Sequence, residues 1–114
     1  MLRNIGDVLG WAAASPEREV CGVVIDGTAL LVPNRATGDA QFRMTVDDLR
    51  LVPGIERMTG VWHSHPDRFP HPSQEDWELH PDGFDLLIVA NGVIRAFTRD
   101  WSSGFTRTVW SSDE

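Results

Sequence analysis

The chain has 114 residues, of which 41% are hydrophobic and 24% are charged. This length and balance predict one globular domain, residues 1–114, built around a single core. The net charge of −7 repels phosphate and excludes nucleic acid as an expected partner. No apolar run approaches the ~20 residues that a membrane span requires, so we expect no membrane partner.

The single cysteine, Cys21, cannot form an internal disulfide and fits a reducing compartment. Its apolar surroundings predict a small core residue, and not a nucleophile or a metal ligand. The N-terminal segment carries Arg3 and three consecutive alanines, but Asp7 interrupts its apolar region, which favours an amphipathic helix over a signal peptide. We therefore expect a cytoplasmic protein.

Hydrophobic periodicity and turn residues predict the elements of the first half of the chain. Ser15-Pro16 ends the first helix, because the residue before a proline disfavours helical geometry. Asp26-Gly27 is a hairpin turn signal between two apolar strands, and Thr45 suits the N-cap of a short helix that ends before Pro53-Gly54. The expected elements are a helix over 3–14, strands over 20–25 and 29–32, a short strand over 41–44 and a helix over 46–51.

The second half predicts a strand, a proline-rich loop, a helix and a final group of strands. Pro66, Pro70 and Pro72 make the loop extended and stiff, and Asn91-Gly92 is the strongest hairpin signal in the chain. The expected elements are a strand over 60–64, a helix over 73–80, strands over 84–90, 93–98 and 105–110, and a polar tail over 111–114. This order predicts an α/β fold in which helices pack on a mixed, strongly curved sheet.

The stretch from His63 to Asp76 carries the most specific pattern in the sequence. His63 and His65 stand one residue apart at the end of a strand, so their side chains point to the same side of it. Two imidazole nitrogens and the carboxylate of Asp76 form a donor set that zinc accepts. A catalytic zinc keeps three protein ligands and leaves its fourth position to water. We therefore expect one zinc ion per chain, bound by His63, His65 and Asp76.

Each half of this pattern also has a plain structural interpretation. A pair such as His63 and His65 also occurs on the wet face of a strand. Ser73 and Asp76 have the spacing of a capping box, in which the serine caps a helix and the aspartate bonds back to it. The metal site and the capping box are compatible, because a capped helix start would hold Asp76 rigidly toward the histidines.

The histidines, serine and aspartate between residues 63 and 76 have the order H-x-H, seven residues, S, two residues, D. This order resembles the signature of the JAMM (MPN-plus, or JAB) metalloprotease family. That family carries its upstream glutamate in a P-x-x-E-x-C-G segment, which residues 16–22 reproduce with Glu19 in register. A further N-x-A…F…D region is matched by Asn34, Phe42 and Asp48. The resemblance runs from about residue 8 to residue 98.

The resemblance implies a fold, a cofactor and residue roles. The fold is a single MPN (JAB)-like domain, a cytidine-deaminase-like α/β sandwich, and the cofactor is one Zn²⁺ per chain. Glu19 would be the general acid/base that takes a proton from the attacking water and hands it to the leaving amine. Ser73 would donate a hydrogen bond to the oxyanion of the intermediate. Glu17, two residues before Glu19, lacks the spacing to the Cys-Gly pair.

Three further aromatic residues near the motif are not expected to bind the metal. His71 lies in the proline-rich loop and is either solvent-facing or part of the substrate groove. His80 is expected at the C-terminal end of a helix, where the helix dipole favours a positive charge. Trp62 is expected in the core and not on a substrate-binding surface.

The implied function is hydrolysis of a peptide or isopeptide bond in a protein or peptide substrate. Family members cleave after the Gly-Gly tail of ubiquitin or ubiquitin-like proteins, bacterial relatives release small sulfur-carrier proteins, and others accompany NlpC/P60 peptidases or tail proteins of phages. The short chain, the segment from Asn34 to Asp48 and the proline-rich loop that ends in Pro72-Ser73 resemble this prokaryotic and phage branch. The connections are too short for the insertions with which the dedicated ubiquitin enzymes of the family clamp ubiquitin. The alternatives are a non-catalytic MPN-type scaffold or phage tail-assembly component that binds protein partners, and a structural metal protein, which would need a fourth ligand.

Overall fold

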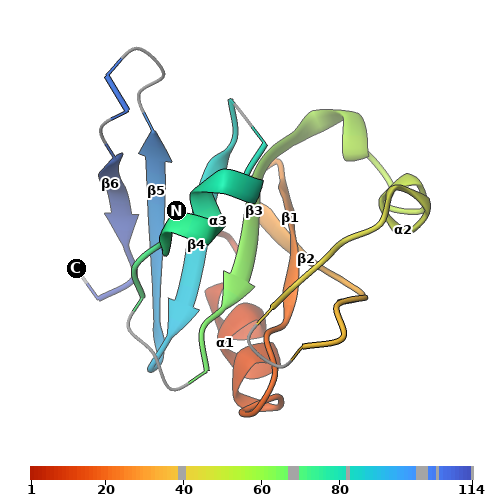
Figure 1. Cartoon of the computed structure of the whole chain (residues 1–114), viewed down its shortest axis with the longest axis horizontal. Coiled ribbons are helices and arrows are strands. Elements are labelled where there is room, and N and C mark those ends of the chain that lie inside the picture. Colours follow the sequence, from red (N-terminus) through yellow and green to blue (C-terminus); the bar gives the residue numbers. More distant parts are fainter. Residues whose placement is uncertain (39–40, 67–69, 82, 100–102, 105, 114) are drawn as a thin grey trace.

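A six-stranded mixed sheet with the strand order β2-β1-β3-β4-β5-β6 organises the molecule (Figure 1). The computed structural model describes residues 1–38, 41–66, 70–81, 83–99, 103–104 and 106–113. The elements are α1 (Ile5–Ala13), β1 (Cys21–Ile25), β2 (Thr28–Val32), α2 (Val46–Arg50), the 3₁₀ helix η1 (Ile55–Arg57), β3 (Met58–Ser64), α3 (Gln74–Leu79), β4 (Asp85–Ala90), β5 (Val93–Arg99) and β6 (Thr106–Ser111). The predicted α/β fold is confirmed.

The two predicted hairpins form where the turn residues indicate. Asp26 and Gly27 have φ angles of 51° and 79° and join β1 to its antiparallel partner β2. Asn91 and Gly92, with φ angles of 52° and 76°, join β4 to β5 in the same way. Positive φ at both central residues is the type I′ geometry, whose twist matches that of the flanking strands. Short-range sequence signals therefore fix both hairpins.

The pairing of β3 with β4 is parallel and places α3 over the sheet. Parallel neighbours need a long crossover connection, and here residues 65–84 supply it with α3 inside. In Figure 1, α3 lies across β3 and β4 in front of the sheet. The crossover therefore places the first residues of α3 on the same face of the sheet as residues at the end of β3.

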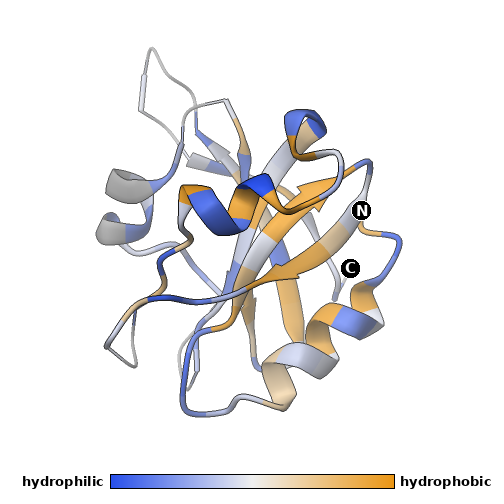
Figure 2. Cartoon of the chain, turned by 90° about the vertical axis from the view of Figure 1, so that its right-hand side faces the viewer, coloured by the Kyte–Doolittle hydropathy of each residue, from blue (hydrophilic) through white to orange (hydrophobic). Residues whose placement is uncertain are grey.

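Helices cover both faces of the sheet, and the side chains that alternate along β4 pack against a helix on each face. Leu87 and Val89 of β4 pack in the cluster that includes Val8 of α1. Their neighbours Leu86 and Ile88 face the other way and pack with Trp77 of α3, whose ring also lies beneath the guanidinium of Arg99 on β5. Figure 2 shows α1 and α3 on opposite sides of the sheet, with hydrophobic strands between them.

Trp62 anchors β3 in the α1 face of this core. Its side chain is fully buried, stacks on Trp11, and donates through Nε1 to the carbonyl oxygen of Leu30 at 3.1 Å. The indole can lie across β1 because Gly22 has no side chain: a Cβ there would stand 2.5 Å from Trp62 Nε1 and 1.8 Å from Leu30 O. The expectation that Trp62 is a core residue is confirmed, and its burial directs His63, the next residue, to the opposite face.

Two local expectations differ from the structure. The predicted strand over 41–44 is wrong: these residues join no sheet, because the side chain of Asn34 binds the carbonyl of Gln41 and the N–H of Arg43. The helical turn η1 was not anticipated, and it follows Gly54, which has a φ of 77°.

Some expectations lie outside the described residues: the middle of the proline-rich loop at 67–69, the first residue of the predicted last strand at 105, and the end of the tail at 114. In the part of the chain that the structure describes, no helix is both long and apolar enough to cross a membrane.

Candidate metal centre

Two buried histidines lie at the end of β3, on the face that α3 covers: His63 is within the strand, and His65 is one residue beyond it. His63 and His65 are 0% and 3% exposed, and their Nε2 atoms lie 2.9 Å apart. The intervening Ser64 exchanges two hydrogen bonds with Val20, from its backbone N–H and to its Oγ, each at 2.9 Å. The N–H of His65 donates to Val89 O at 2.8 Å. These backbone bonds keep the segment extended, so both imidazoles point to the same side.

The start of α3 brings a carboxylate to both histidines. Asp76 Oδ1 lies 3.1 Å from His63 Nε2, and Asp76 Oδ2 lies 3.0 Å from His65 Nε2. The capping box also forms: Ser73 Oγ accepts from the Asp76 N–H at 3.1 Å, and the Ser73 N–H donates to Asp76 Oδ2 at 2.8 Å. The capping interpretation and the approach of Asp76 to the histidines therefore hold together, as the sequence allowed.

The spacing of these donor atoms fits a small tetrahedral ion. Zinc bonds to nitrogen and oxygen of roughly 2.0–2.1 Å place neighbouring tetrahedral ligands about 3.3 Å apart. The Nε2 atoms of His63 and His65 and the oxygens of Asp76 are separated by 2.9–3.1 Å. The donor set of two imidazoles and one carboxylate also matches the preference of zinc. The residues present thus fit the metal that the sequence predicts.

Asp76 is held in the ionised form that a metal ligand requires. Burial by itself raises the pKa of this carboxyl group. The hydrogen bonds from His63 and His65, together with the N–H of Ser73, outweigh burial and hold the pKa of Asp76 well below its usual range. Asp76 is therefore a carboxylate at neutral pH.

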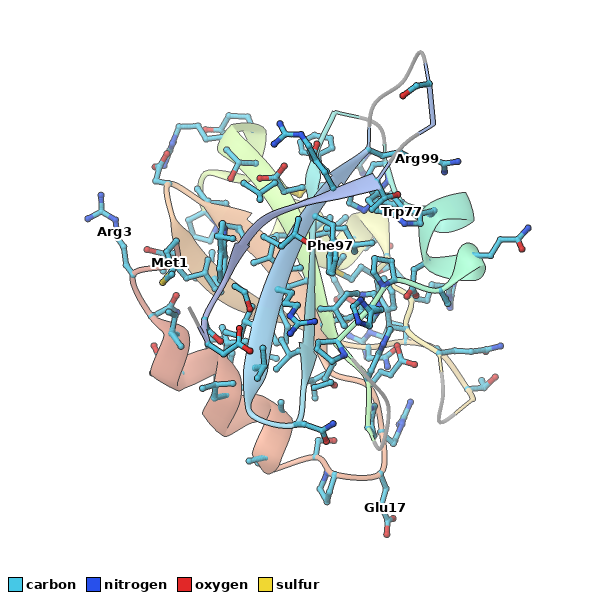
Figure 3. All side chains as sticks on the ribbon, turned by 90° about the vertical axis from the view of Figure 1, so that its left-hand side faces the viewer. Met1, Arg3, Glu17, Trp77, Phe97 and Arg99 are labelled. Atoms are coloured by element: carbon cyan, nitrogen blue, oxygen red, sulfur yellow. The ribbon has the colours of Figure 1, made fainter. Side chains whose placement is uncertain are left out.

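A second, more deeply buried carboxylate lies near the two histidines. Glu19 directly precedes Val20 and is 3% exposed. Its Oε1 lies 4.0 Å from His63 Nε2, which is too long for a hydrogen bond. Glu19, His63 and His65 bring ligand atoms within 4.8 Å of one another, so this buried group could hold a metal ion. Glu17 is exposed and points away from the molecule in Figure 3, so it takes no part.

A cavity of about 640 Å³ opens beside these groups. Glu19, Ser73 and Asp76 line it on the side of the candidate metal centre, while Met44, Leu49, Met58 and Val61 form an apolar wall. A volume of roughly 300–1,000 Å³ is typical of pockets that bind small molecules and cofactors. The cavity thus joins polar, reactive groups to an apolar surface.

Comparison with known proteins identifies the family. The family model of prokaryotic homologues of the JAB domain matches residues 5–103. The chain belongs to this family. It is similar to the solution structure of a protein from Desulfitobacterium hafniense, with a TM-score of 0.74 and 22% identity over 93% of this chain and 85% of that one, a likeness of fold alone. A search of curated proteins gave no match. The resemblance to the JAB family that the motif indicates is confirmed.

The other two histidines of this JAB domain are not in the buried group of Glu19, His63 and His65. His71 is exposed and does not line the cavity, and its ring centre lies 6.3 Å from that of Phe97. His80 follows the last residue of α3, as expected, and its Nε2 lies 2.6 Å from Phe84 O. His80 also lines the cavity. Sequence reasoning missed that position, because no pattern in the sequence signals which residues the crossover returns to the cavity.

The cysteine of the JAB domain is buried on β1, where it pairs with His63 of β3. Cys21 is fully buried, and its Sγ donates to Val32 O at 3.6 Å. Burial first, and the negative charge of Glu19 second, raise the pKa of the Cys21 thiol to about 12. A thiol with this pKa has almost no thiolate at neutral pH, and the thiolate is the nucleophile and metal ligand.

We therefore expect the native protein to resist a chromogenic disulfide reagent at pH 8. In denaturant the same reagent should titrate one thiol per chain, because the chain has a single cysteine. Absorbance of the released thiolate measures both reactions. Complete reaction of the native protein within minutes would contradict the buried, protonated state of Cys21.

Proposed function

We propose that this JAB-family chain is a zinc-dependent peptidase or isopeptidase, which hydrolyses a peptide or isopeptide bond with a water activated at the metal centre. The observation that carries the proposal is the convergence at the end of β3. Two buried imidazoles and the Asp76 carboxylate meet at about 3 Å spacing, and the buried carboxylate of Glu19 lies 4.0 Å from His63. His63, His65 and Asp76 are the proposed ligands of one zinc ion.

Zinc bound there would lower the pKa of water toward ~7 and polarise the carbonyl group under attack. The protein has to move the proton, and Glu19 is the proposed general acid/base. Its carboxylate lies at the cavity wall beside His63 without being one of the three proposed ligands. It can therefore take the proton of the attacking water and deliver it to the amine that leaves.

Ser73 is the proposed donor to the oxyanion of the tetrahedral intermediate. Its hydroxyl accepts one hydrogen bond from the Asp76 N–H and lines the cavity. A serine hydroxyl has one donor proton besides its acceptor lone pairs, so the capping bond leaves the proton of Ser73 for the substrate. One residue thus serves the helix and the reaction.

The proposed substrate is a protein or peptide segment that enters the cavity beside the metal centre. Candidates are a ubiquitin-like or sulfur-carrier protein with a Gly-Gly tail, and an NlpC/P60 or tail protein in a phage context. The proposed setting is the cytoplasm of a bacterial or phage-infected cell. A test is cleavage of peptide and ubiquitin-like fusions that contain a Gly-Gly junction, with zinc-loaded and metal-free protein compared by mass spectrometry. Absence of cleavage across such a panel at full zinc loading would favour the non-catalytic scaffold.

Metal content is expected to be about one zinc per chain in protein purified without added metal. Asp76→Ala should lose most of the zinc, because it removes one of the three proposed ligands. The double variant His63→Ala/His65→Ala should lose all of the zinc. The matched control is His71→Ala, since His71 is exposed and away from the site. Elemental analysis after gel filtration measures each content. Wild-type zinc content in the double histidine variant would refute the ligand set.

A further inference from the structure

The side chain of Asn34 uses its whole hydrogen-bonding capacity beside the candidate metal centre. Its Nδ2 donates to Glu19 O at 2.8 Å and to Gln41 O at 2.9 Å. Its Oδ1 accepts from the N–H groups of Ala36 at 2.9 Å and Arg43 at 3.0 Å. A carboxamide offers two donor protons and two acceptor lone pairs. An aspartate in this place would lose both donors, and an apolar residue would lose all four bonds.

These four hydrogen bonds join the backbone of Glu19 to the loop of residues 34–44, whose described residues are not held by strand pairing. Residues 34–44 form no strand or helix where the structure describes them. Asn34 binds the residues on either side of Phe42, and Arg35 N–H donates to Arg43 O at 2.8 Å. The loop is therefore closed around one side chain.

The residue that this closure positions is Phe42. Its ring stacks on the imidazole of His63 with ring centres 4.3 Å apart and an angle of 21° between the planes. The stack covers one face of a ring whose other contacts include His65 and Asp76. A ring packed in this way cannot rotate freely, and the apolar cover limits access of water, both of which tune a metal site. The position of the Phe42 ring depends on its two backbone neighbours.

We propose that Asn34 is a positioning residue of the metal centre: it holds Phe42 against His63 and fixes the backbone that carries Glu19. The proposal rests on the function proposed above, and it assigns to Asn34 no contact with substrate or metal. Because one side chain serves both connections, its loss should disturb a proposed ligand and the proposed general acid/base together. Loss of the Phe42 ring alone should disturb only His63, the proposed ligand on which that ring stacks.

The test compares Asn34→Ala and Asn34→Asp with Asn4→Ala. Asn4 is a matched control, because its amide also joins two segments: Nδ2 donates to Ala29 O and Oδ1 accepts from Ala29 N, each at 2.8 Å. That bridge ties the start of α1 to β2 and involves no residue of the metal centre. Loss of stability alone would therefore affect the Asn4 and Asn34 variants alike. Asn34→Asp keeps the side-chain volume and can still accept from the N–H groups of Ala36 and Arg43, but it loses both donated bonds. It is the variant to use if Asn34→Ala does not fold.

Two measurements do not depend on catalysis. The first is the NMR signal of the His63 ring protons, which a stacked Phe42 ring shifts upfield with or without metal; both Asn34 variants should lose this shift and Asn4→Ala should keep it. The second is zinc affinity in competition with a chromogenic chelator. Loss of a group that orients a metal ligand typically weakens affinity ~10–100-fold, and we expect a change of this size in the Asn34 variants only. Phe42→Leu should weaken zinc similarly, with less effect on hydrolysis at equal zinc loading.

The outcomes separate this inference from the proposed function. If the wild-type protein binds zinc and hydrolyses substrate, but both Asn34 variants keep the His63 ring shift and the zinc affinity of wild type, the inference is overturned and the proposed function stands. Equal changes in Asn4→Ala would also overturn it, since they would reflect general loosening. If the wild-type protein hydrolyses none of the substrates, while both Asn34 variants lose the His63 ring shift, the proposed function is overturned and the positioning role of Asn34 is supported.

Discussion

Glu19→Gln is expected to keep the fold and the zinc of this chain while slowing hydrolysis by ~10²–10⁴-fold. Glutamine has nearly the same volume and can still hydrogen-bond to water, but it cannot take a proton. Glu19 is buried and lies 4.0 Å from His63, and it is not among the three proposed ligands, so its replacement removes proton transfer and leaves the ligand set intact. This separation of catalysis from metal binding is the strictest test of the proposed mechanism.

The measurement is the rate of cleavage of a Gly-Gly fusion substrate by wild type and variant at equal zinc content, with folding checked by circular dichroism. Glu17→Gln is the matched control, because it makes the same chemical change two residues away on an exposed side chain. Its rate should equal that of wild type. If Glu19→Gln cleaves as fast as wild type, the acid/base role is wrong even where the zinc site is right.

The spacing of the motif is enough to predict most of the candidate site. His63 and His65 share a face because strand side chains alternate, and the capping box places the Asp76 carboxylate at the first turn of α3. The hairpin turns at Asp26-Gly27 and Asn91-Gly92 were predictable for a similar reason, since each depends on two adjacent residues. Local rules suffice where the geometry is set by neighbours in the chain.

The parts that could not be predicted depend on contacts between distant residues. Residues 41–44 have an extended, partly apolar pattern, yet the bonds of Asn34 to Gln41 and Arg43 keep them out of the sheet. The stack of Phe42 on His63 and the position of His80 at the cavity depend on how the loop and the crossover fold back. No periodicity in the sequence encodes such contacts.

Ser73→Ala should lower kcat by roughly 10²–10³-fold if the serine hydroxyl serves the oxyanion. The same change should cost about 1 kcal/mol of folding stability, because Ser73 Oγ also accepts the Asp76 N–H as the N-cap of α3. The two effects share a residue, so the stability loss must be reproduced elsewhere before the rate is interpreted. Thermal melts and initial rates at equal zinc loading give the two quantities.

Thr45→Ala is the matched control for this variant. Thr45 is the N-cap of α2, where its Oγ1 accepts the Asp48 N–H at 3.2 Å, and it does not line the cavity. Its loss should likewise cost about 1 kcal/mol while kcat stays near the wild-type value. Equal loss of rate in Thr45→Ala and Ser73→Ala would mean that loss of a helix cap alone slows the proposed hydrolysis, and Ser73 would then have no role at the oxyanion. A rate loss confined to Ser73→Ala, with matching loss of stability in both variants, would instead support the proposed role of the Ser73 hydroxyl at the oxyanion.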